Sequence, residues 1–415
     1  MDTRSFVDRA TNIRINGNWL YYAALWLYFF SGTLSDSMLT QFPAVARMSH
    51  YMSILCIPLF LARLLLLERF RIPAFFSFIV LFTLTAVIYT YSGSRLPMYI
   101  ILCLYGAENV SSVSIGKIYL SSTGLVVVLS TALSLLGVVQ DRLFYPVGRS
   151  VRHSLGMNYV TIWAGYVFFL MAALLYIRRD YKWKWYSFVP YVAMSYVVNR
   201  FCSARLESLM ILVLPILLLI DGKISTNKVY QFLNINSFGL SALITYALQY
   251  QYSIDPTRYA ELDRIMSFRL RETQRVLDQY AVNLFGQSIR MQGHGTVNFD
   301  TGFGYFFVDA FYINFALRYG AVVMLCLIVL FHVVSKRLYK DGYSRENVYI
   351  LLSCVHGMII SSILTPYFNP LFLIVFAAYS TSEQEADVQA IAQRHGHYDH
   401  PYLRGHEKQR RLPVN

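Results

Sequence analysis

Charged residues are scarce in this sequence, and their scarcity argues against a soluble fold. Only 14% of the 415 residues are Asp, Glu, Lys or Arg, whereas 56% are hydrophobic and 16% are aromatic. A soluble domain carries about 25% charged residues to cover its surface. The five cysteines have no paired spacing, and the sequence contains neither a glycine-rich phosphate loop nor an acidic cluster at magnesium spacing. We therefore expect no disulfide scaffold, no metal site, no P-loop chemistry and no cofactor.

The apolar residues fall into long blocks. Most blocks approach the ~20 residues that a helix needs to cross the hydrocarbon core of a membrane. Backbone polar groups must be paired internally in lipid, so such blocks are helical. We predict an all-α integral membrane protein, a polytopic bundle of about 12 transmembrane helices (range ~11–14). The predicted spans are 18–34, 51–67, 73–91, 96–107, 118–139, 157–177, 185–199, 206–220, 229–252, 306–335, 348–364 and 367–381.

The basic residues predict how the bundle is oriented. They are concentrated in alternate loops and in the C-terminal tail, and the positive-inside rule places these loops and both termini in the cytoplasm. This bias accounts for most of the +13 net charge without a nucleic-acid partner. The mixed-charge segment before the first block carries no small-residue cleavage site, so we expect the first block to be a retained anchor.

The opposite face of the membrane carries basic residues of one type. All eight lysines map to the cytoplasmic side, and every basic residue outside is an arginine. The planar fork of arginine suits bidentate binding of phosphate, which predicts an external, membrane-level ligand that carries phosphate. The alternative is that these side chains snorkel or pair with acidic residues of the outer loops. The outer arginines are Arg47, Arg95, Arg142, Arg149, Arg152, Arg200, Arg205, Arg258, Arg264, Arg269, Arg271, Arg275, Arg290 and Arg318.

Two outer segments are longer than the rest. Residues 140–156 hold three arginines and His153, and residues 253–305 form a long loop. The first half of the long loop, 256–286, has apolar residues at helical spacing and predicts an amphipathic helix or helix pair. Its second half is rich in glycine and polar residues and should be irregular. Long loops in compact architectures are usually functional, so we expect a lid over an outward-facing cavity.

Two ionisable residues lie at the starts of predicted spans. Arg205 is in the segment NRFCSARLESLMILVL and Asp309 is in GYFFVDAFYINFALRYG. Ionisable groups at membrane depth are costly and indicate function. The alternative is an Arg–Asp ion pair that joins two spans.

Four stretches, read in order, resemble the Wzy-type bacterial polysaccharide polymerases, which are relatives of the O-antigen ligases. SVRHSLGMNYVTIWA (150–164) resembles an Arg–x–Ser–Leu–Gly motif, although Asn158 and Tyr159 stand where His-Pro-Asn usually follows. CSARLESLMIL (202–212) is similar to a Ser-Arg motif that opens a central span, and the segment 264–286 resembles an outer-loop stretch ending in Phe-Gly. VDAFYINFALRYGAVV (308–323) resembles an Asp–Asn–x–Tyr pattern in which Ala310 replaces the usual Asn.

The resemblance implies a membrane glycosyltransferase of GT-C-like architecture. Such enzymes join oligosaccharide repeat units carried on undecaprenyl diphosphate at the outer face of the bacterial cytoplasmic (inner) membrane, so donor and acceptor are both lipid-linked. A chain-length co-polymerase would be a further partner, and the product would be an O-antigen, capsule or exopolysaccharide. No metal is needed if arginines stabilise the departing diphosphate.

The resemblance also assigns roles to residues. Asp309 matches the acceptor-activating position, which is His in the ligases, and His153 and His294 are further candidates for this role. Tyr312 either contacts sugar or packs in the core. The residues predicted to hold the diphosphates are arginines, namely Arg149, Arg152, Arg205, Arg269 and Arg318, with Arg95 at the mouth of a span.

We expect four regions: transmembrane helices over 1–252, an extracytoplasmic loop over 253–305, further transmembrane helices over 306–381 and a cytoplasmic basic tail over 382–415. Two other functions remain open. An O-antigen ligase shares the fold and donor, but its His-Asn pattern is replaced by Asp309-Ala310. A lipid-linked oligosaccharide transporter or flippase fits the span count, but the sequence has no repeat between halves and its charges gather on one face.

Overall fold

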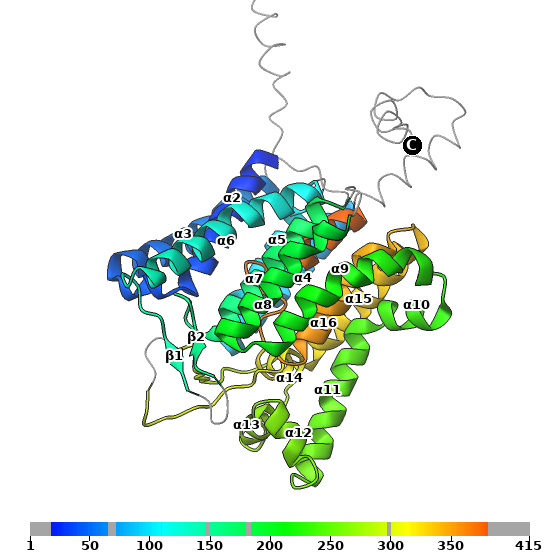
Figure 1. The fold of residues 1–415 in the computed structure, drawn as a ribbon. Coiled ribbons are helices and arrows are strands. Elements are labelled where there is room, and N and C mark those ends of the chain that lie inside the picture. Colours follow the sequence, from blue (N-terminus) through cyan, green and yellow to red (C-terminus); the bar gives the residue numbers. More distant parts are fainter. Residues whose placement is uncertain are drawn as a thin grey trace, which may run out of the picture.

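The computed structural model describes residues 18–64, 72–108, 110–145, 150–179, 184–296 and 300–380, with backbone alone for 72–74. The described chain is a bundle of helices (Figure 1). Its first half contains α2 (Asn18–Ser35), η1 (Met38–Gln41), α3 (Pro43–Ala62), α4 (Ile72–Ser92), α5 (Leu96–Gly106), α6 (Ser112–Leu135), α7 (Val160–Ile177), η3 (Trp185–Phe188), α8 (Val189–Val197) and the π-helical turn η4 (Val198–Cys202).

The second half of the described chain is also helical. It contains α9 (Arg205–Ile224), α10 (Lys228–Ile235), α11 (Ser237–Ile254), α12 (Ala260–Ile265), α13 (Arg269–Leu277), α14 (Phe311–Tyr319), α15 (Ala321–Lys340), α16 (Ser344–Gly357) and a last apolar helix, Leu371–Ser380. Strand structure in the described residues is limited to a two-stranded antiparallel hairpin, β1 (Leu143–Phe144) with β2 (Arg152–His153), and two isolated bridges.

Five helices are long and apolar enough to cross a membrane: Pro43–Ala62, Phe75–Ser92, Ser112–Leu135, Val160–Ile177 and Ala321–Lys340. Their lateral surfaces expose large apolar side chains, as at Phe76 (70% exposed), Val128 (68%) and Leu325 (62%). A protein in water would bury such residues, whereas lipid solvates them. The all-α, membrane-protein character predicted from the sequence is therefore confirmed, and the number of twelve spans stays a prediction.

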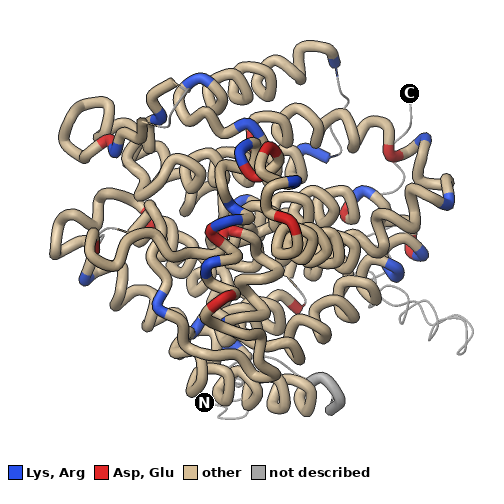
Figure 2. Tube along the Cα trace, turned by 90° about the horizontal axis from the view of Figure 1, so that it is seen from below, with Lys and Arg blue, Asp and Glu red and all other residues tan. Residues whose placement is uncertain are grey.

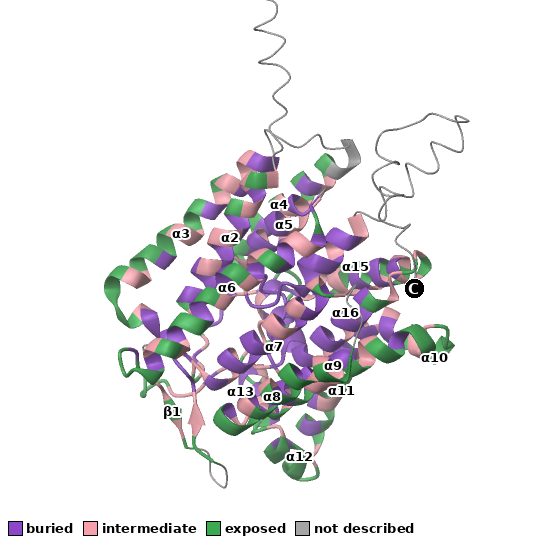
Figure 3. Ribbon diagram, turned by 45° about the horizontal axis from the view of Figure 1, so that its top comes forward, coloured by how far each residue is buried: buried purple, intermediate pink, exposed green. Residues whose placement is uncertain are grey.

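Burial separates central helices from peripheral ones (Figure 3). Within its membrane-length window α7 is 72% buried, whereas α3 is 17% buried. The short helix α14 is buried at every position except Arg318. A helix of nine residues is too short to span a bilayer, so α14 is a core element that packs among longer helices.

The two longest predicted spans are not single helices. The stretch 306–335 contains an extended entry, then α14, a break at Gly320 and the long helix α15. The stretch 229–252 is divided at Asn236 into α10 and α11. Hydropathy alone missed both breaks because apolar residues continue on each side of them.

The break at Gly320 is a docking site for residues 283–286, inside the long loop. Gly320 has φ +96°, and a Cβ there would lie 2.2 Å from the carbonyl oxygen of Leu284. Gly286 has φ +82°, and a Cβ there would lie 2.2 Å from the carbonyl oxygen of Arg318. Each residue must therefore lack a side chain for the two backbones to meet. The amide of Ala321 donates to the carbonyl of Asn283 (2.9 Å), which satisfies a free N–H at the start of α15.

The β1–β2 hairpin and the helices α12 and α13 lie at the same end of the bundle, at the bottom of Figure 1, and we call it the loop end. The start of α2 lies at the opposite end. Viewed from the loop end, acidic and basic positions lie next to each other near the middle of the molecule (Figure 2). The candidate site is found among these charges.

Candidate functional site at the loop end

An ion pair between the long loop and the segment before α14 forms the centre of the site. Arg269 Nε lies 3.3 Å from Asp309 Oδ2, and the two side chains are 19% and 25% exposed. The hydroxyl of Tyr305 donates to the same Asp309 oxygen at 3.0 Å. Burial and the neighbouring Asp309 raise the pKa of Tyr305, so its phenol stays protonated and remains a donor. Asp309 Oδ1 has no hydrogen-bond partner in the described part of the chain.

A tight turn between α12 and α13 places Arg269. Ser267 and Phe268 both adopt the left-handed conformation, with φ 61° and 65°. Asp263 closes the turn, because its Oδ1 accepts the amide of Leu270 at 2.9 Å. Left-handed residues other than glycine cost free energy and gather at functional sites. Here they direct the first side chain of α13 toward Asp309.

A second carboxylate lies near Arg269 from the bundle side. Burial opposes the charge of Arg269, but Asp309 and Glu207 outweigh it and raise the pKa of the guanidinium. Glu207 is 3% exposed in the first turn of α9, and its Oε1 lies 3.3 Å from Nε2 of His356 at the end of α16. The His356 ring is buried against Phe168 and Phe169 of α7. Three helices of the core, α7, α9 and α16, thus converge at the Glu207–His356 pair.

Sequence reasoning did not single out Glu207 or His356. Both are ionisable residues inside predicted apolar spans, and this is the signal that should have identified them. Neither has a recognisable motif around it. Their pairing depends on the packing of α9 against α16, which no local pattern specifies.

His294 lies in an aromatic cage beside the ion pair. Its ring is 4.6 Å from that of Tyr305, 6.0 Å from that of Tyr159 and 6.3 Å from that of Phe144, centroid to centroid. Burial lowers the pKa of His294; Asp309 raises it, but Arg142 lowers it again. The ring is therefore largely neutral near pH 7 and can accept or donate a hydrogen bond.

Two other arginines of the loop end bind backbone carbonyls. The Nη1 of Arg142 donates to the carbonyls of Asn158 (3.1 Å) and Thr296 (3.4 Å). The Nε of Arg152 donates to the carbonyl of Cys202 at 2.7 Å. These bonds join the hairpin to the start of α7, the long loop and the turn before α9. The site is consequently assembled from segments far apart in the sequence.

The structure places other predicted residues away from this pair. His153 is bound to Asp141 within the hairpin, Nδ1 to Oδ2 at 2.6 Å. Tyr312 is fully buried and donates to the carbonyl of Cys354 at 2.9 Å, which is a packing role. The Arg318 guanidinium lies over the Tyr319 ring, 5.4 Å from its centroid. Arg95 is exposed at the corner between α4 and α5. Arg149 lies outside the described residues.

Arg205 is on a different face of α9 from Glu207. It is exposed and shares a helical stripe with Leu209, Ile216 and Leu219, which are 56%, 49% and 42% exposed. Residues two apart on a helix point to different sides. Arg205 therefore lies on an exposed, largely apolar face of α9 and away from the core. The structure does not bring it to Arg269 and Asp309.

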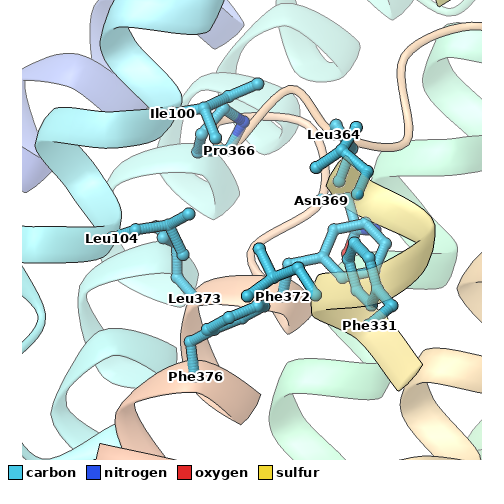
Figure 4. Close-up of a pocket in the computed structure, with 11 residues that line it drawn as sticks. Ile100, Leu104, Phe331, Leu364, Pro366, Asn369, Phe372, Leu373 and Phe376 are labelled. Carbon is cyan, nitrogen blue, oxygen red and sulfur yellow. The ribbon is translucent and has the colours of Figure 1, made fainter. Parts of the chain in front are cut away.

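An apolar crevice lies between α5, α15 and the last helix (Figure 4). Ile100, Leu104, Phe331 and Phe376 line it, and the one polar lining side chain, Asn369, is bonded to backbone. It has no group that could react with a substrate. In the described part of the chain no group of three or more His, Cys, Asp and Glu side chains could hold a metal ion.

No protein-family model matches the sequence, and comparisons with curated proteins and with solved structures found no match. The residues of the loop end are therefore the only indication of its chemistry. They offer a cationic fork, a carboxylate with one free oxygen, a phenol that donates and a neutral imidazole, all beside membrane-length helices.

Proposed function

We propose that this protein is a polysaccharide polymerase that joins undecaprenyl-diphosphate-linked oligosaccharide repeat units at the outer face of the cytoplasmic membrane. The observation that carries the proposal is the Arg269–Asp309 pair, which is partly exposed at the loop end and supported from below by Glu207. The guanidinium group of an arginine can bind a diphosphate through two donors, and a carboxylate can accept the proton of an acceptor hydroxyl. Both groups are present within one hydrogen-bonding distance of each other.

The proposed reaction is a displacement at the anomeric carbon of the growing chain. The bond from that carbon to the diphosphate oxygen breaks, and a bond to the acceptor hydroxyl oxygen forms. Arg269 stabilises the negative charge that develops on the departing diphosphate. Asp309 orients the acceptor hydroxyl through its free Oδ1 and takes up the proton that the hydroxyl loses. No redox partner is required.

The surrounding residues have supporting roles in this proposal. Tyr305 fixes the Asp309 carboxylate by donating to Oδ2, so that Oδ1 is left for substrate. Glu207 keeps Arg269 in place when the diphosphate competes with Asp309 for its donors. Neutral His294, packed on Tyr305, is placed to hydrogen-bond a sugar hydroxyl.

Deletion of the gene in its source strain tests the proposal. We expect surface polymer to disappear and single lipid-linked repeat units to accumulate with their sugars exposed to the outer face. Complementation with the intact chain should restore the polymer. If the deletion instead traps units on the cytoplasmic face, the protein is a transporter. If polymer is made at full length but is not attached to its final acceptor, the ligase function holds.

A further inference from the structure

A second carboxylate at the loop end has no role in the chemistry above. Asp36 follows α2, and its Oδ2 accepts the hydroxyl of Tyr166 at 2.7 Å. Its side chain is partly exposed, and within the described part of the chain its other oxygen, Oδ1, has no hydrogen-bond partner and no cation. An exposed carboxylate oxygen without a protein partner is accessible to a hydrogen-bond donor of a ligand.

Other protected carboxylates of the described chain are better satisfied. Glu207 pairs with His356, Glu346 with Arg179 and Asp309 with Arg269. Asp221, like Asp36, has no cation, but hydroxyl groups donate to both of its oxygens, from Tyr230 (2.9 Å) and Ser344 (2.7 Å). Asp36 thus differs from Asp221 in that a hydroxyl group donates to only one of its two carboxylate oxygens.

An aromatic ring is held near Asp36. Tyr367, which precedes the last helix, sits directly over Gly32, where a Cβ would lie 2.2 Å from the ring. Gly32 and Asp36 are four residues apart and share one face of α2. Tyr367 is close enough to Asp36 for the two groups to interact electrostatically, and its side chain is partly exposed. The Tyr166 ring packs on Phe368, 4.9 Å between centroids, which fixes both tyrosines.

This cluster adjoins the Arg269–Asp309 site. The amide of Asn158 donates to the carbonyl of Asp36 at 2.9 Å, and its side chain donates to the carbonyl of Ser35 at 3.0 Å. The next residue, Tyr159, faces His294 in the site already described. A ligand longer than one sugar could therefore reach both places.

We propose that Asp36, Tyr166 and Tyr367 form a saccharide subsite, in which Asp36 accepts hydrogen bonds from sugar hydroxyls and Tyr367 packs against the sugar ring. A carboxylate accepts from two neighbouring hydroxyls, and an aromatic ring matches the apolar face of a pyranose. A bound cation would need more oxygen ligands than this cluster supplies. The subsite rests on the proposed function, since it binds the non-reducing part of the acceptor unit.

The test uses the full-length protein in nanodiscs and one defined probe. The probe is the repeat-unit oligosaccharide released by mild acid from the lipid-linked units of the deletion strain, and saturation-transfer NMR measures its binding. Intact protein should bind it. Asp36→Asn and Tyr367→Ala should each weaken binding by about tenfold or more, since a hydrogen bond to a charged group contributes about this much. Tyr166→Phe keeps the Asp36 carboxylate but removes the hydroxyl that donates to it, so this variant should weaken binding less.

Two controls separate this inference from the proposed function. Asp221→Asn alters the matched carboxylate in the last turn of α9 and should bind normally. Asp300→Asn, which alters an exposed ion pair with Arg290 in the long loop, should also bind normally. Unchanged binding by Asp36→Asn would overturn the subsite. The subsite would also be overturned if the intact protein failed to bind the probe at concentrations up to about 10 mM, although cells still required the protein to make polymer. If the deletion strain makes normal polymer, the proposed function itself fails.

Discussion

Arg269, the first residue of α13, and Asp309, the residue two positions before α14, form an ion pair of 3.3 Å although 40 positions separate them. The pair ties the long loop to the buried helix α14. Both side chains are partly exposed. The contact is thus accessible to a ligand and is supported by the core, which are the two properties that a catalytic constellation requires.

Asp309→Asn removes the proposed acceptor-activating group with little change in shape. We expect polymer formation to fall by about 100-fold or more, because general base catalysis contributes about 10²–10⁴-fold. The amount of folded protein in the membrane should be unchanged. Polymer length on gels and accumulated lipid-linked units measure the effect.

Asp300→Asn is the matched control for that substitution. Asp300 pairs with Arg290 at 3.0 Å in the same long loop, but its side chain is 48% exposed. Exposed ion pairs contribute about 0–1 kcal/mol, so this variant should polymerise normally. Equal activity of both variants would remove Asp309 from the mechanism.

Arg205→Lys should behave differently from Arg269→Lys. Arg205 lies on the exposed apolar stripe of α9, away from the core, where lysine keeps the charge, and we expect at least half of the normal polymer. Lysine at position 269 keeps the charge but loses the fork that can contact carboxylate and phosphate together. The two variants are compared at equal expression. Loss of polymer in Arg205→Lys would place that arginine in the diphosphate site after all.

Gly286→Ala should loosen the long loop from the bundle. A methyl group there would meet the carbonyl of Arg318, and the residue would also be strained at φ +82°. Gly304 has a similar φ of +74° with open space around it. Gly304→Ala therefore measures the cost of the left-handed backbone alone, about 1–2 kcal/mol, without a steric clash. Gly286→Ala should lower the thermal midpoint further and speed proteolytic cleavage within 253–305. Equal effects of the two substitutions would show that the Gly286–Gly320 contact is unimportant.

Asp36→Asn should change how stability depends on pH. Burial raises the pKa of Asp36 from 3.8 to about 7, against the opposing effect of the Tyr166 hydrogen bond. The folded state thus holds the proton more tightly than the unfolded state, and intact protein loses stability as pH rises from about 4 to about 7. The groups that face Asp36 are the phenols of Tyr166 and Tyr367, which stay neutral in this range.

Asparagine mimics the protonated acid, so the variant should avoid that loss. We expect it to be more stable than intact protein by at least ~1 kcal/mol at pH 8, with the difference shrinking toward pH 4, since one pH unit corresponds to about 1.4 kcal/mol. Thermal unfolding in nanodiscs across this range measures it. A difference that stays constant with pH would mean that Asp36 has an ordinary pKa.

Much of the architecture could be predicted from the sequence because lipid imposes a strong constraint. Apolar blocks of membrane length must be helical, and the described helices fall where those blocks lie. Gly320 was harder to recognise. A glycine within an apolar run indicates a break only when another backbone approaches it, and Leu284, its neighbour in space, is 36 positions away.

The site was predictable to a smaller extent. Asp309 stood out because an ionisable residue at the start of an apolar span is costly, and Arg269 was one of fourteen outer arginines. The left-handed turn at 267–268 and the packing of α13 place Arg269, rather than another of these arginines, beside Asp309. Neither feature has a sequence signature. Arg205 and Glu207 show the same limit, since the helical rotation of α9 decides which of the two faces the core.

Reconstitution of the purified protein with lipid-linked repeat units is the most direct test of the central claim. Units extracted from the deletion strain would be supplied in proteoliposomes, and products would be separated by size. We predict a ladder of multiples of the repeat unit with release of undecaprenyl diphosphate, and at least ~10-fold slower growth of the ladder with Arg269→Lys. Absence of a ladder with intact, folded protein, or equal ladders from both proteins, would contradict the account.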